Sequence, residues 1–493
     1  DHLVVARTRK HIRGLSDNLT FPEMLPPQNE YLDSLEVDDY SKFEDILIAL
    51  PKYFAAYKPA VYIEQAETGN SVLENESLRD QFLVVMLNKL LVKRLESSWT
   101  AFHSTLKAVK TVHFNTLQSV RAYIEHKEDG EIITETSLFD QLEDDPDIPL
   151  GKREIRLSEI EKAGNMAKFK NHLESDVQQL TAMIEKLDLY AALISNESSN
   201  QSKDSKLERL ITLTKEQCHK NKSTETRKLL IFTSYKDTAD YLFSELSKRG
   251  ITKMACISGA GARTSDQPDH YQSDFEPILE RFCPYTKLYR ERDWPDFEHK
   301  DADREAYQRW ETWVSERNTN IADKLNTPIE IVIATDCLSE GQNLQDCDTI
   351  INYDIHWNPV RVIQRLGRID RIGSPNEKVR GINFWPAPNM NEYLGLQRRV
   401  EDRAVAIASA GSEVPILTGE VGDRLRDEQF EEEQEARMLR HMETSWEDLE
   451  NQSDHLSFSD LSLEVFRQDL LKELSNDHNH YDDMPLGIYT GFD

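Results

Sequence analysis

The sequence predicts an α/β protein with a parallel sheet in the middle of the chain, a mostly helical region before it and an acidic helical tail after it. Three observations predict this fold class: short apolar segments that alternate with helical ones, an earlier apolar seam of helical period, and a late run rich in Asp and Glu. Alternating strands and helices form parallel sheets that helices cover on both faces. The predicted domains are therefore 1–205, 206–400 and 401–493.

Composition sets bounds on function. The 493 residues carry 59 Lys and Arg against 89 Asp and Glu, a net charge of −30. This charge argues against a wholly basic nucleic-acid coat, because phosphate binding needs clustered positive charge, but it leaves room for a local basic channel. No apolar run is long enough to cross a membrane, so we expect no membrane partner. The five scattered cysteines favour a reducing, cytoplasmic compartment without a disulfide framework or a cysteine-rich zinc site.

The first predicted domain is mostly helical. Prolines in 21–27 predict a break in regular structure, and 78–126 then reads as one or two long helices. In these helices basic residues outnumber acidic ones. Two interpretations stay open: a solvated helix face, or a surface that follows a nucleic-acid backbone, for which Lys93 and Arg94 are the candidate contacts.

A second long helix follows, before a polar linker over 195–205. Its apolar residues step alternately by four and three, which is typical of a helix packed on another. They are Leu173, Val177, Leu180, Ile184, Leu187, Ala191 and Ile194. The Ser- and Asn-rich linker marks the boundary with the sheet domain.

The sheet domain contains five predicted strands and one large insertion. The strands are expected over 229–232, 253–257, 330–334, 348–353 and 379–385, with a helix over 236–249. The insertion, 262–325, separates the second strand from the third. Ten aromatic residues within 271–313 favour a folded helical insertion whose aromatic side chains form a core. In the tail, twelve acids against four basic residues within 420–450 predict an exposed acidic helix, which could dock a basic protein partner.

Polar residues follow the third predicted strand. Ligands of parallel sheets bind beyond the carboxyl ends of the strands, which makes this segment a candidate site. Asp336 and Glu340 could bond hydroxyl groups or orient a cation, and Gly341 would let the backbone approach a ligand closely.

The segment Q-R-L-G-R-I-D-R, residues 364–371, carries a pair of arginines three residues apart. If this segment is helical, Arg368 and Arg371 share a face. Two guanidinium groups on one face suit a polyphosphate, because each can donate two hydrogen bonds and neither can lose its charge. The spacing alone equally allows a surface helix with ordinary salt bridges.

These segments resemble known motifs in a known order. Residues 364–371 resemble the Q-x-x-G-R-x-x-R motif of superfamily 2 helicases and translocases, although Asp370 stands where many members have His. Residues 339–345 (S-E-G-Q-N-L-Q) are similar to the preceding motif of the Swi/Snf-type branch. Residues 227–242 and 348–360 resemble further segments of the second RecA-like lobe. Residues 93–106 resemble a helix of bacterial Swi/Snf-type proteins, including the RNA-polymerase-associated ATPase, and residues 4–12 the basic end of their first lobe.

The resemblance implies the C-terminal, RecA-like lobe of an ATP-driven helicase or translocase acting on nucleic acid, with duplex DNA favoured over RNA. It implies that Arg368 and Arg371 reach the γ-phosphate of ATP. The other implied site residues form three sets. Gln364 and Gly367 shape the turn, Asp336, Glu340 and Gly341 couple nucleotide to nucleic acid, and Thr233 and Ser234 hold backbone phosphates.

Two required motifs are missing from the sequence. ATP hydrolysis in this superfamily needs a G-x-x-x-x-G-K-[S/T] loop for the phosphates and an acidic motif for magnesium. The Gly151–Lys152 pair is followed by Arg153 and preceded by Pro146 at the first glycine position. We therefore expect ATP and Mg²⁺ to be held mainly by a first lobe that this sequence lacks, and this chain alone to be inactive. A helicase-derived, non-catalytic scaffold is the alternative.

Overall fold

The computed structural model describes the residues 21–32, 43–63, 71–126, 131–133, 154–196, 204–218, 228–297, 304–338, 341–356, 359–387, 390 and 394. The chain divides into two compact units. The sheet unit comprises the described residues within 1–34, 95–101 and 198–445, and the helical unit those within 35–94 and 102–197. The predicted acidic tail lies outside the described residues.

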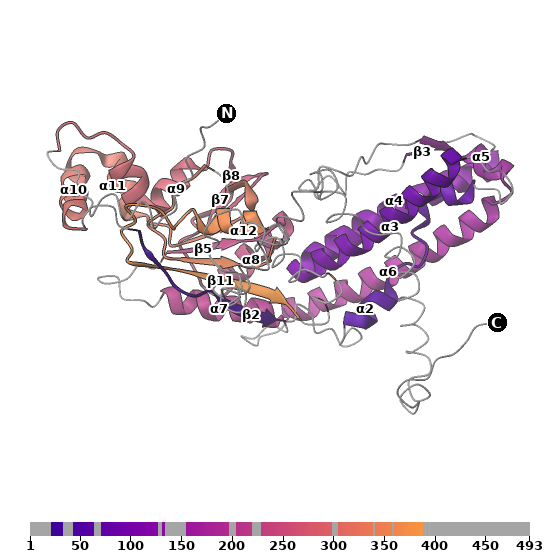
Figure 1. Cartoon of the computed structure of the whole chain (residues 1–493), viewed down its shortest axis with the longest axis horizontal. Helices are drawn as coiled ribbons and strands as arrows, with labels where there is room; N and C mark the ends of the chain where they lie inside the picture. Colours follow the sequence, from indigo (N-terminus) through magenta and orange to yellow (C-terminus); the bar gives the residue numbers. More distant parts are fainter. Residues whose placement is uncertain are drawn as a thin grey trace, which may run out of the picture. The chain divides into compact units, whose positions relative to one another are not determined.

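The sheet unit contains nine strands, and most of them run parallel (Figure 1). They are β1 (Glu23–Met24), β2 (Gln28–Leu32), β5 (Leu229–Phe232), β6 (Met254–Ser258), β7 (Gly261–Thr264), β8 (Gln267–Gln272), β9 (Ile331–Ala334), β10 (Thr349–Asn352) and β11 (Lys378–Pro386). Their order is β1-β11-β10-β5-β9-β6-β7-β8, and β2 also pairs with β11. Only the β6–β7 and β7–β8 pairs are antiparallel. The five predicted strands and the α/β class are confirmed.

The central strands end at a common edge. β5, β6, β9 and β10 are buried at every position, as expected for strands covered on both faces. Their register aligns Phe232 with both Ala334 and Asn352, the last residues of β9 and β10. The residues that follow these strands are thereby brought to one carboxyl edge.

Helices cover both faces of the sheet. The helices of this unit are α7 (Ser205–Cys218), α8 (Lys236–Lys248), α9 (Glu276–Phe282), α10 (Arg304–Arg317), α11 (Thr319–Asn326) and α12 (Pro359–Leu366). On one face Leu230 and Phe232 share a core with Ile278 and Phe282 of α9. α8 belongs to none of that core and packs against β6 and β9, hence from the opposite face.

The N-terminal strands were not expected from the proline-rich sequence. β1 and β2 pair in parallel with β11, with Glu23 opposite Lys378 and Gln28 opposite Ile382. Pro22, Pro26 and Pro27 flank these strands rather than interrupt them, so the missing amide donors fall outside the ladder.

The insertion begins as strands and continues as helices. β7 and β8 extend the sheet as a hairpin, and α9, a π-helical segment η4 (Tyr285–Arg290), α10 and α11 follow. Tyr289 and Trp310 are fully buried in a separate aromatic core that also includes Tyr285, Leu288, Val314 and Ile321. The aromatic residues thus form a core, as predicted, whereas the first residues of the insertion are strands rather than helices.

The helical unit contains the long helices α3 (Ser71–Ser97), α4 (Trp99–His126) and α6 (Met166–Asn196), with α2 (Phe43–Ala49), η1 (Ala55–Tyr57), η2 (Pro59–Tyr62), α5 (Leu157–Lys162) and a two-stranded sheet, β3 (Glu131–Ile133) and β4 (Glu154–Arg156). The predicted seam of α6 is buried at Leu173, Leu180 and Leu187, which confirms its helical period. The residues that join α3 to α4, 95–101, belong to the sheet unit.

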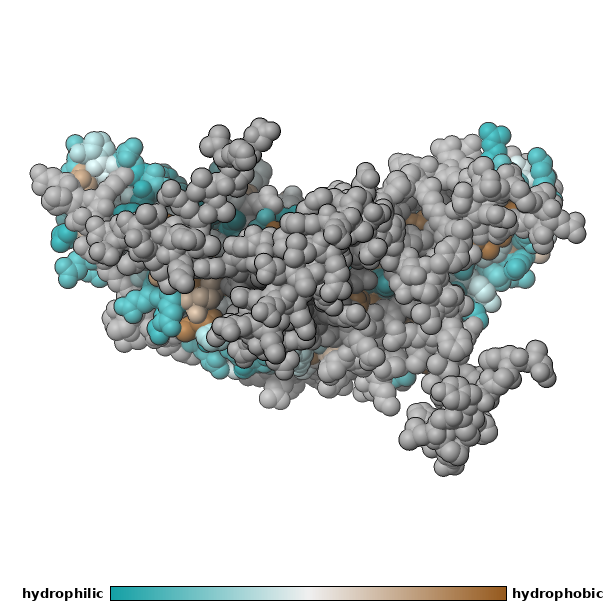
Figure 2. All heavy atoms as spheres, viewed as in Figure 1, coloured by the Kyte–Doolittle hydropathy of each residue, from teal (hydrophilic) through white to brown (hydrophobic). Residues whose placement is uncertain are grey.

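The described residues on the face shown in Figure 2 are mainly polar. Figure 2 shows teal over most of the described residues on that face, with brown in small separate spots. The large exposed apolar residues are Tyr31, Phe114, Ile124, Leu189, Tyr271, Val360 and Ile372, of which Phe114 and Ile124 both lie on α4. Single exposed residues of this kind do not define a docking surface. Within the described ranges, no helix has the length and apolarity needed to cross a membrane.

Candidate nucleotide and nucleic-acid site

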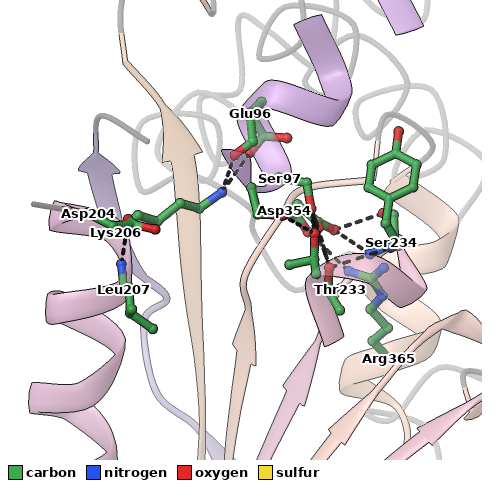
Figure 3. A network of polar contacts seen from close by, with 12 residues as sticks. Glu96, Ser97, Asp204, Lys206, Leu207, Thr233, Ser234, Asp354 and Arg365 are labelled. Atoms are coloured by element: carbon green, nitrogen blue, oxygen red, sulfur yellow. Dashed lines mark hydrogen bonds and ion pairs between the residues drawn. The ribbon is translucent and has the colours of Figure 1, made fainter. Parts of the chain in front are cut away.

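Polar residues that follow three strands lie at the carboxyl edge of the sheet. Figure 3 shows those that follow β5 and β10. Thr233 and Ser234 follow β5, Asp336 follows β9, and Asp354 lies two residues beyond β10. The shared register of the strands explains why these residues converge although they are far apart in sequence.

Asp354 is the centre of this network. Its Oδ2 accepts hydrogen bonds from the hydroxyls of Ser97 at 2.7 Å and Thr233 at 2.6 Å. Its Oδ1 accepts from the amide and the hydroxyl of Ser234, at 2.7 and 2.8 Å. Ser97 is the last residue of α3, so this carboxylate fastens the α3–α4 junction to the end of the sheet.

Arg365 of α12 joins two of these strand ends. Its Nε and Nη2 donate to the two carboxylate oxygens of Asp336 at 2.8 and 2.9 Å, a bidentate pair. Its Nη1 donates to Asn352 Oδ1 and to the Asp354 carbonyl, both at 3.2 Å. The guanidinium also lies 5.2 Å from the centre of the Phe232 ring.

The charges of this network are matched in the interior. Burial by itself would raise the pKa of Asp354, but the positive charges of Arg365 and Lys206 and the hydroxyl hydrogen bonds lower it below its usual range. Burial likewise opposes the charge of Arg365, yet the Asp336 carboxylate raises the pKa of this guanidinium. Both groups are therefore ionised at neutral pH and hold each other in place.

A second buried pair lies beside the first. Lys206 of α7 donates to the carbonyl and carboxylate of Glu96, at 2.6 and 3.3 Å, and its ammonium lies 4.5 Å from the centre of the Tyr353 ring. Asp204 accepts from the Leu207 amide at the start of α7. Burial raises the pKa of Asp204 to about 6, more strongly than its hydrogen bonds and the Lys206 charge lower it.

The arginine pair lies beyond the end of a helix. α12 ends at Leu366, so Arg368 and Arg371 occupy the turns after it rather than a continued helix face, a correction to the helical expectation. The glycine at 367 explains the tight turn, because a Cβ there would lie 3.3 Å from the Ile363 carbonyl oxygen.

A loop after β9 holds both arginines. Arg368 donates to the carbonyls of Gln364 at 3.0 Å and Gln342 at 3.3 Å. Arg371 donates to the Gly367 carbonyl at 3.0 Å and to Asn343 Oδ1. The acceptors in these four hydrogen bonds are backbone carbonyl oxygens and one side-chain amide oxygen.

The remaining predicted residues are placed as follows. Gly341 has φ +79°, a conformation that favours glycine, in the loop that holds the arginines. Gln364 lies on α12, and its Oε1 is buried without a hydrogen-bond partner among the described residues. Arg94 is 5% exposed and Lys93 is half-buried, both on α3. Glu340 lies outside the described residues.

The structure thus brings Asp336, Thr233 and Ser234 into one network, and Gln364, Gly367, Gly341 and the arginine pair into a second cluster that α12 joins to it. Sequence reasoning missed Asp354 and Arg365. Asp354 follows a strand end, the same signal that singled out Asp336, and Arg365 lies inside the arginine-rich motif.

Comparison with known proteins identifies this part of the chain. Residues 311–373 match the helicase conserved C-terminal domain family. The matched segment includes Asp336, Arg365 and the arginine pair. This part of the sheet unit is therefore similar to the helicase conserved C-terminal domain family, and the α/β fold class that the sequence predicts is confirmed.

Two curated relatives are similar over short segments. An uncharacterised ATP-dependent helicase of Bacillus subtilis (strain 168), YqhH, is 47% identical over 55 residues, which are 11% of this chain and 10% of the relative. The ATP-dependent RNA helicase dbp8 of Aspergillus oryzae is 33% identical over 89 residues, 18% of this chain and 19% of the relative. The chain thus covers less than a fifth of the length of either relative.

A solved structure, the C-terminal part of the Fun30 ATPase domain, covers 76% of this chain and 89% of its own, at 13% identity and a TM-score of 0.31.

Proposed function

We propose that this chain is the C-terminal motor lobe of an ATP-driven nucleic-acid translocase of the Swi/Snf type, and that it supplies Arg368 and Arg371 to the γ-phosphate of ATP bound on a first lobe. The observation that carries the proposal is that both guanidinium groups donate to the loop that follows β9, within the segment that matches the helicase conserved C-terminal domain family.

The residues present fit the phosphates of ATP. Phosphoryl transfer spreads negative charge over the equatorial oxygens of the transferred group, and fixed positive charges aimed at those oxygens lower the barrier. Arg371 is half-buried and donates to a carbonyl and an amide oxygen, which phosphate oxygens can replace as acceptors. The unpartnered Gln364 Oε1 nearby is free to orient a water or hydroxyl.

Mg²⁺ would be held elsewhere. Among the described residues, no three His, Cys, Asp or Glu side chains gather in a way that could hold a metal ion. Asp336 accepts two hydrogen bonds from Arg365, which supports a positioning role for its carboxylate. On the resemblance to the superfamily motifs, we propose that the first lobe holds both Mg²⁺ and the phosphates.

Nucleic-acid contacts stay predictions. The Ser234 amide and hydroxyl lie at the carboxyl edge but donate to Asp354, and the buried Thr233 hydroxyl does the same. The burial of Arg94 makes Lys93 the better candidate on α3. We favour duplex DNA as substrate and a cytoplasmic location, on the resemblance to the Swi/Snf-type motifs.

A two-lobe protein, in which a lobe with a phosphate loop precedes this chain, tests the proposal. We expect Arg371→Lys to lower nucleic-acid-stimulated phosphate release by about 10³ or more, because an ammonium cannot replace a planar guanidinium. Arg317→Lys, an exposed arginine on α10, is the matched control and should leave turnover unchanged. Near-normal turnover of Arg371→Lys would refute the proposal, and greater stimulation by RNA than by duplex DNA would correct its substrate.

The absence of a phosphate loop from this sequence favours one second candidate, a helicase-derived scaffold that docks a basic partner through 420–450. Binding of a basic partner that is lost on deleting 420–450, with no hydrolysis by the two-lobe protein, would support the scaffold over the motor.

A further inference from the structure

The π-helical segment of the insertion lies against the loop that follows β9. The amides of Tyr285 and Thr286 donate to the two carboxylate oxygens of Asp346, each at 2.9 Å. The carboxylate lies at the N-terminal end of η4, where the free amides favour a negative charge. Asp346 therefore fixes the beginning of η4 to the loop.

Two further contacts extend along the same loop. Lys287 Nζ donates to Gln342 Oε1 at 2.7 Å. Asn343 Nδ2 donates at 2.8 Å to Oε1 of Glu291, the residue that directly follows η4. The insertion thus contacts this loop from the middle of η4 and from both of its ends.

The same two loop residues hold the arginine pair. The Gln342 carbonyl accepts from Arg368, and Asn343 Oδ1 accepts from Arg371. The Leu344 amide also donates to the Arg368 carbonyl at 3.0 Å. Gln342 and Asn343 each make one contact with the insertion and one with an arginine, so a shift of η4 must displace the arginines or break these hydrogen bonds.

Lys287 is not needed for the insertion's own core. Its side chain is 7% exposed and pairs with Glu276 at 3.1 Å and Glu291 at 3.4 Å, whereas the core of the insertion is apolar and aromatic. Burying an ammonium is costly unless carboxylates and hydrogen-bond acceptors compensate it, as Glu276, Glu291 and Gln342 do here. Short π-helical segments also occur frequently at functional sites.

We propose that the insertion is a positioning device for the arginine pair, in which Lys287 and Glu291 are positioning residues that act through Gln342 and Asn343. The part of this inference that concerns hydrolysis rests on the proposed function. Displacement of a reacting group by about 1 Å can cost about 10² in rate, so a ligand or partner that moves η4 would control turnover.

Amide exchange on this chain tests the coupling without any nucleotide. We expect Lys287→Met to speed exchange in 341–346 and 367–371 about tenfold or more, because a charge-assisted hydrogen bond is lost. Lys324→Met is the matched control, because Lys324 pairs with Glu280 inside the insertion rather than with a described residue of the loop. Equal amide exchange rates in Lys287→Met and Lys324→Met, in both segments, would overturn the inference.

Variants at Glu291 give a second, milder test, because this side chain is partly exposed. Glu291→Gln keeps an acceptor for Asn343, so the amides of 367–371 should exchange at the wild-type rate in this variant. In Glu291→Leu the same amides should exchange faster. In the two-lobe protein, Glu291→Leu should lower kcat and leave KM for ATP nearly unchanged. Glu291→Gln should have the kcat of the wild-type protein. Equal kcat in Leu and Gln variants would overturn the positioning role, whereas a wild-type protein without hydrolysis would overturn the proposed function instead.

Discussion

Replacing Arg365 by Met should unfold the sheet unit at markedly lower urea concentration. The side chain is fully buried, and its guanidinium joins Asp336, Asn352 and the Asp354 carbonyl. Removing one partner of a buried ion pair costs about 3–5 kcal/mol, because the other charge is left uncompensated. The Asp336 side chain is 25% exposed, so water can partly replace the lost donors, and we expect the lower value, about 3 kcal/mol.

With a urea m-value of about 2–3 kcal/mol/M, this loss moves the midpoint by about 1–1.5 M. Because the chain has two units, the assay is pulsed amide exchange of β9 and β10 at increasing urea, which reports the sheet unit alone. Arg365→Lys keeps the charge but not the bidentate geometry. Its urea midpoint should therefore lie between those of Arg365→Met and the wild-type protein. Arg317→Met, at a side chain 55% exposed, should move the midpoint by less than about 0.4 M. A shift of Arg365→Met no larger than this control would refute the reasoning.

Four further predictions follow from the same structure. This chain alone should release phosphate from ATP at background rate with or without DNA, because it lacks a phosphate loop, and turnover that Arg371→Ala abolishes would contradict this. Asp204 has a pKa near 6 in the folded protein against about 3.9 unfolded, so the folded state binds more protons between these values and its stability falls as pH rises through them, by about 3 kcal/mol. Asp204→Asn should remove this slope in pH-dependent urea unfolding, and an unchanged slope would assign it to another group. Trp310→Ala should destabilise the insertion by about 3–5 kcal/mol, seen as faster amide exchange in α10 and α11 but not in β5, and unaltered exchange would show that the aromatic core is dispensable. Lys93→Glu should reduce the slope of log affinity for duplex DNA against log salt by about one, whereas the same slope as wild type would return this residue to a solvated helix face.

The sequence was sufficient for the parts of the fold that depend on local pattern. The buried run over 229–232 has the period and length of a central strand, and β5 has these bounds. The polar segment after 330–334 was recognisable because it follows a strand end, and Asp336 indeed lies at the carboxyl edge of the sheet. Spacing also selected the arginine pair, although it could not show that α12 ends before them.

The rest depended on contacts between distant residues. Ser97 and Asp354 are 257 residues apart, and no local pattern pairs a serine at a helix end with a carboxylate after a strand. β2 pairs with the last strand of the sheet despite the prolines that precede it. The contacts of Lys287 and Glu291 with the loop after β9 could not be read from the aromatic-rich insertion, whose composition predicts only that it folds.

The central claim is that Arg371 contacts the phosphoryl group during its transfer. The most direct test measures the affinity of the two-lobe protein for ADP alone and for ADP with aluminium fluoride. Aluminium fluoride mimics the phosphoryl group in transfer. Interactions made mainly in the transition state strengthen binding of the mimic more than binding of the product. We predict that Arg371→Lys binds ADP within about tenfold of wild type but loses about 10³ of the additional affinity for the mimic. Equal additional affinity in the variant and in wild type would contradict the account.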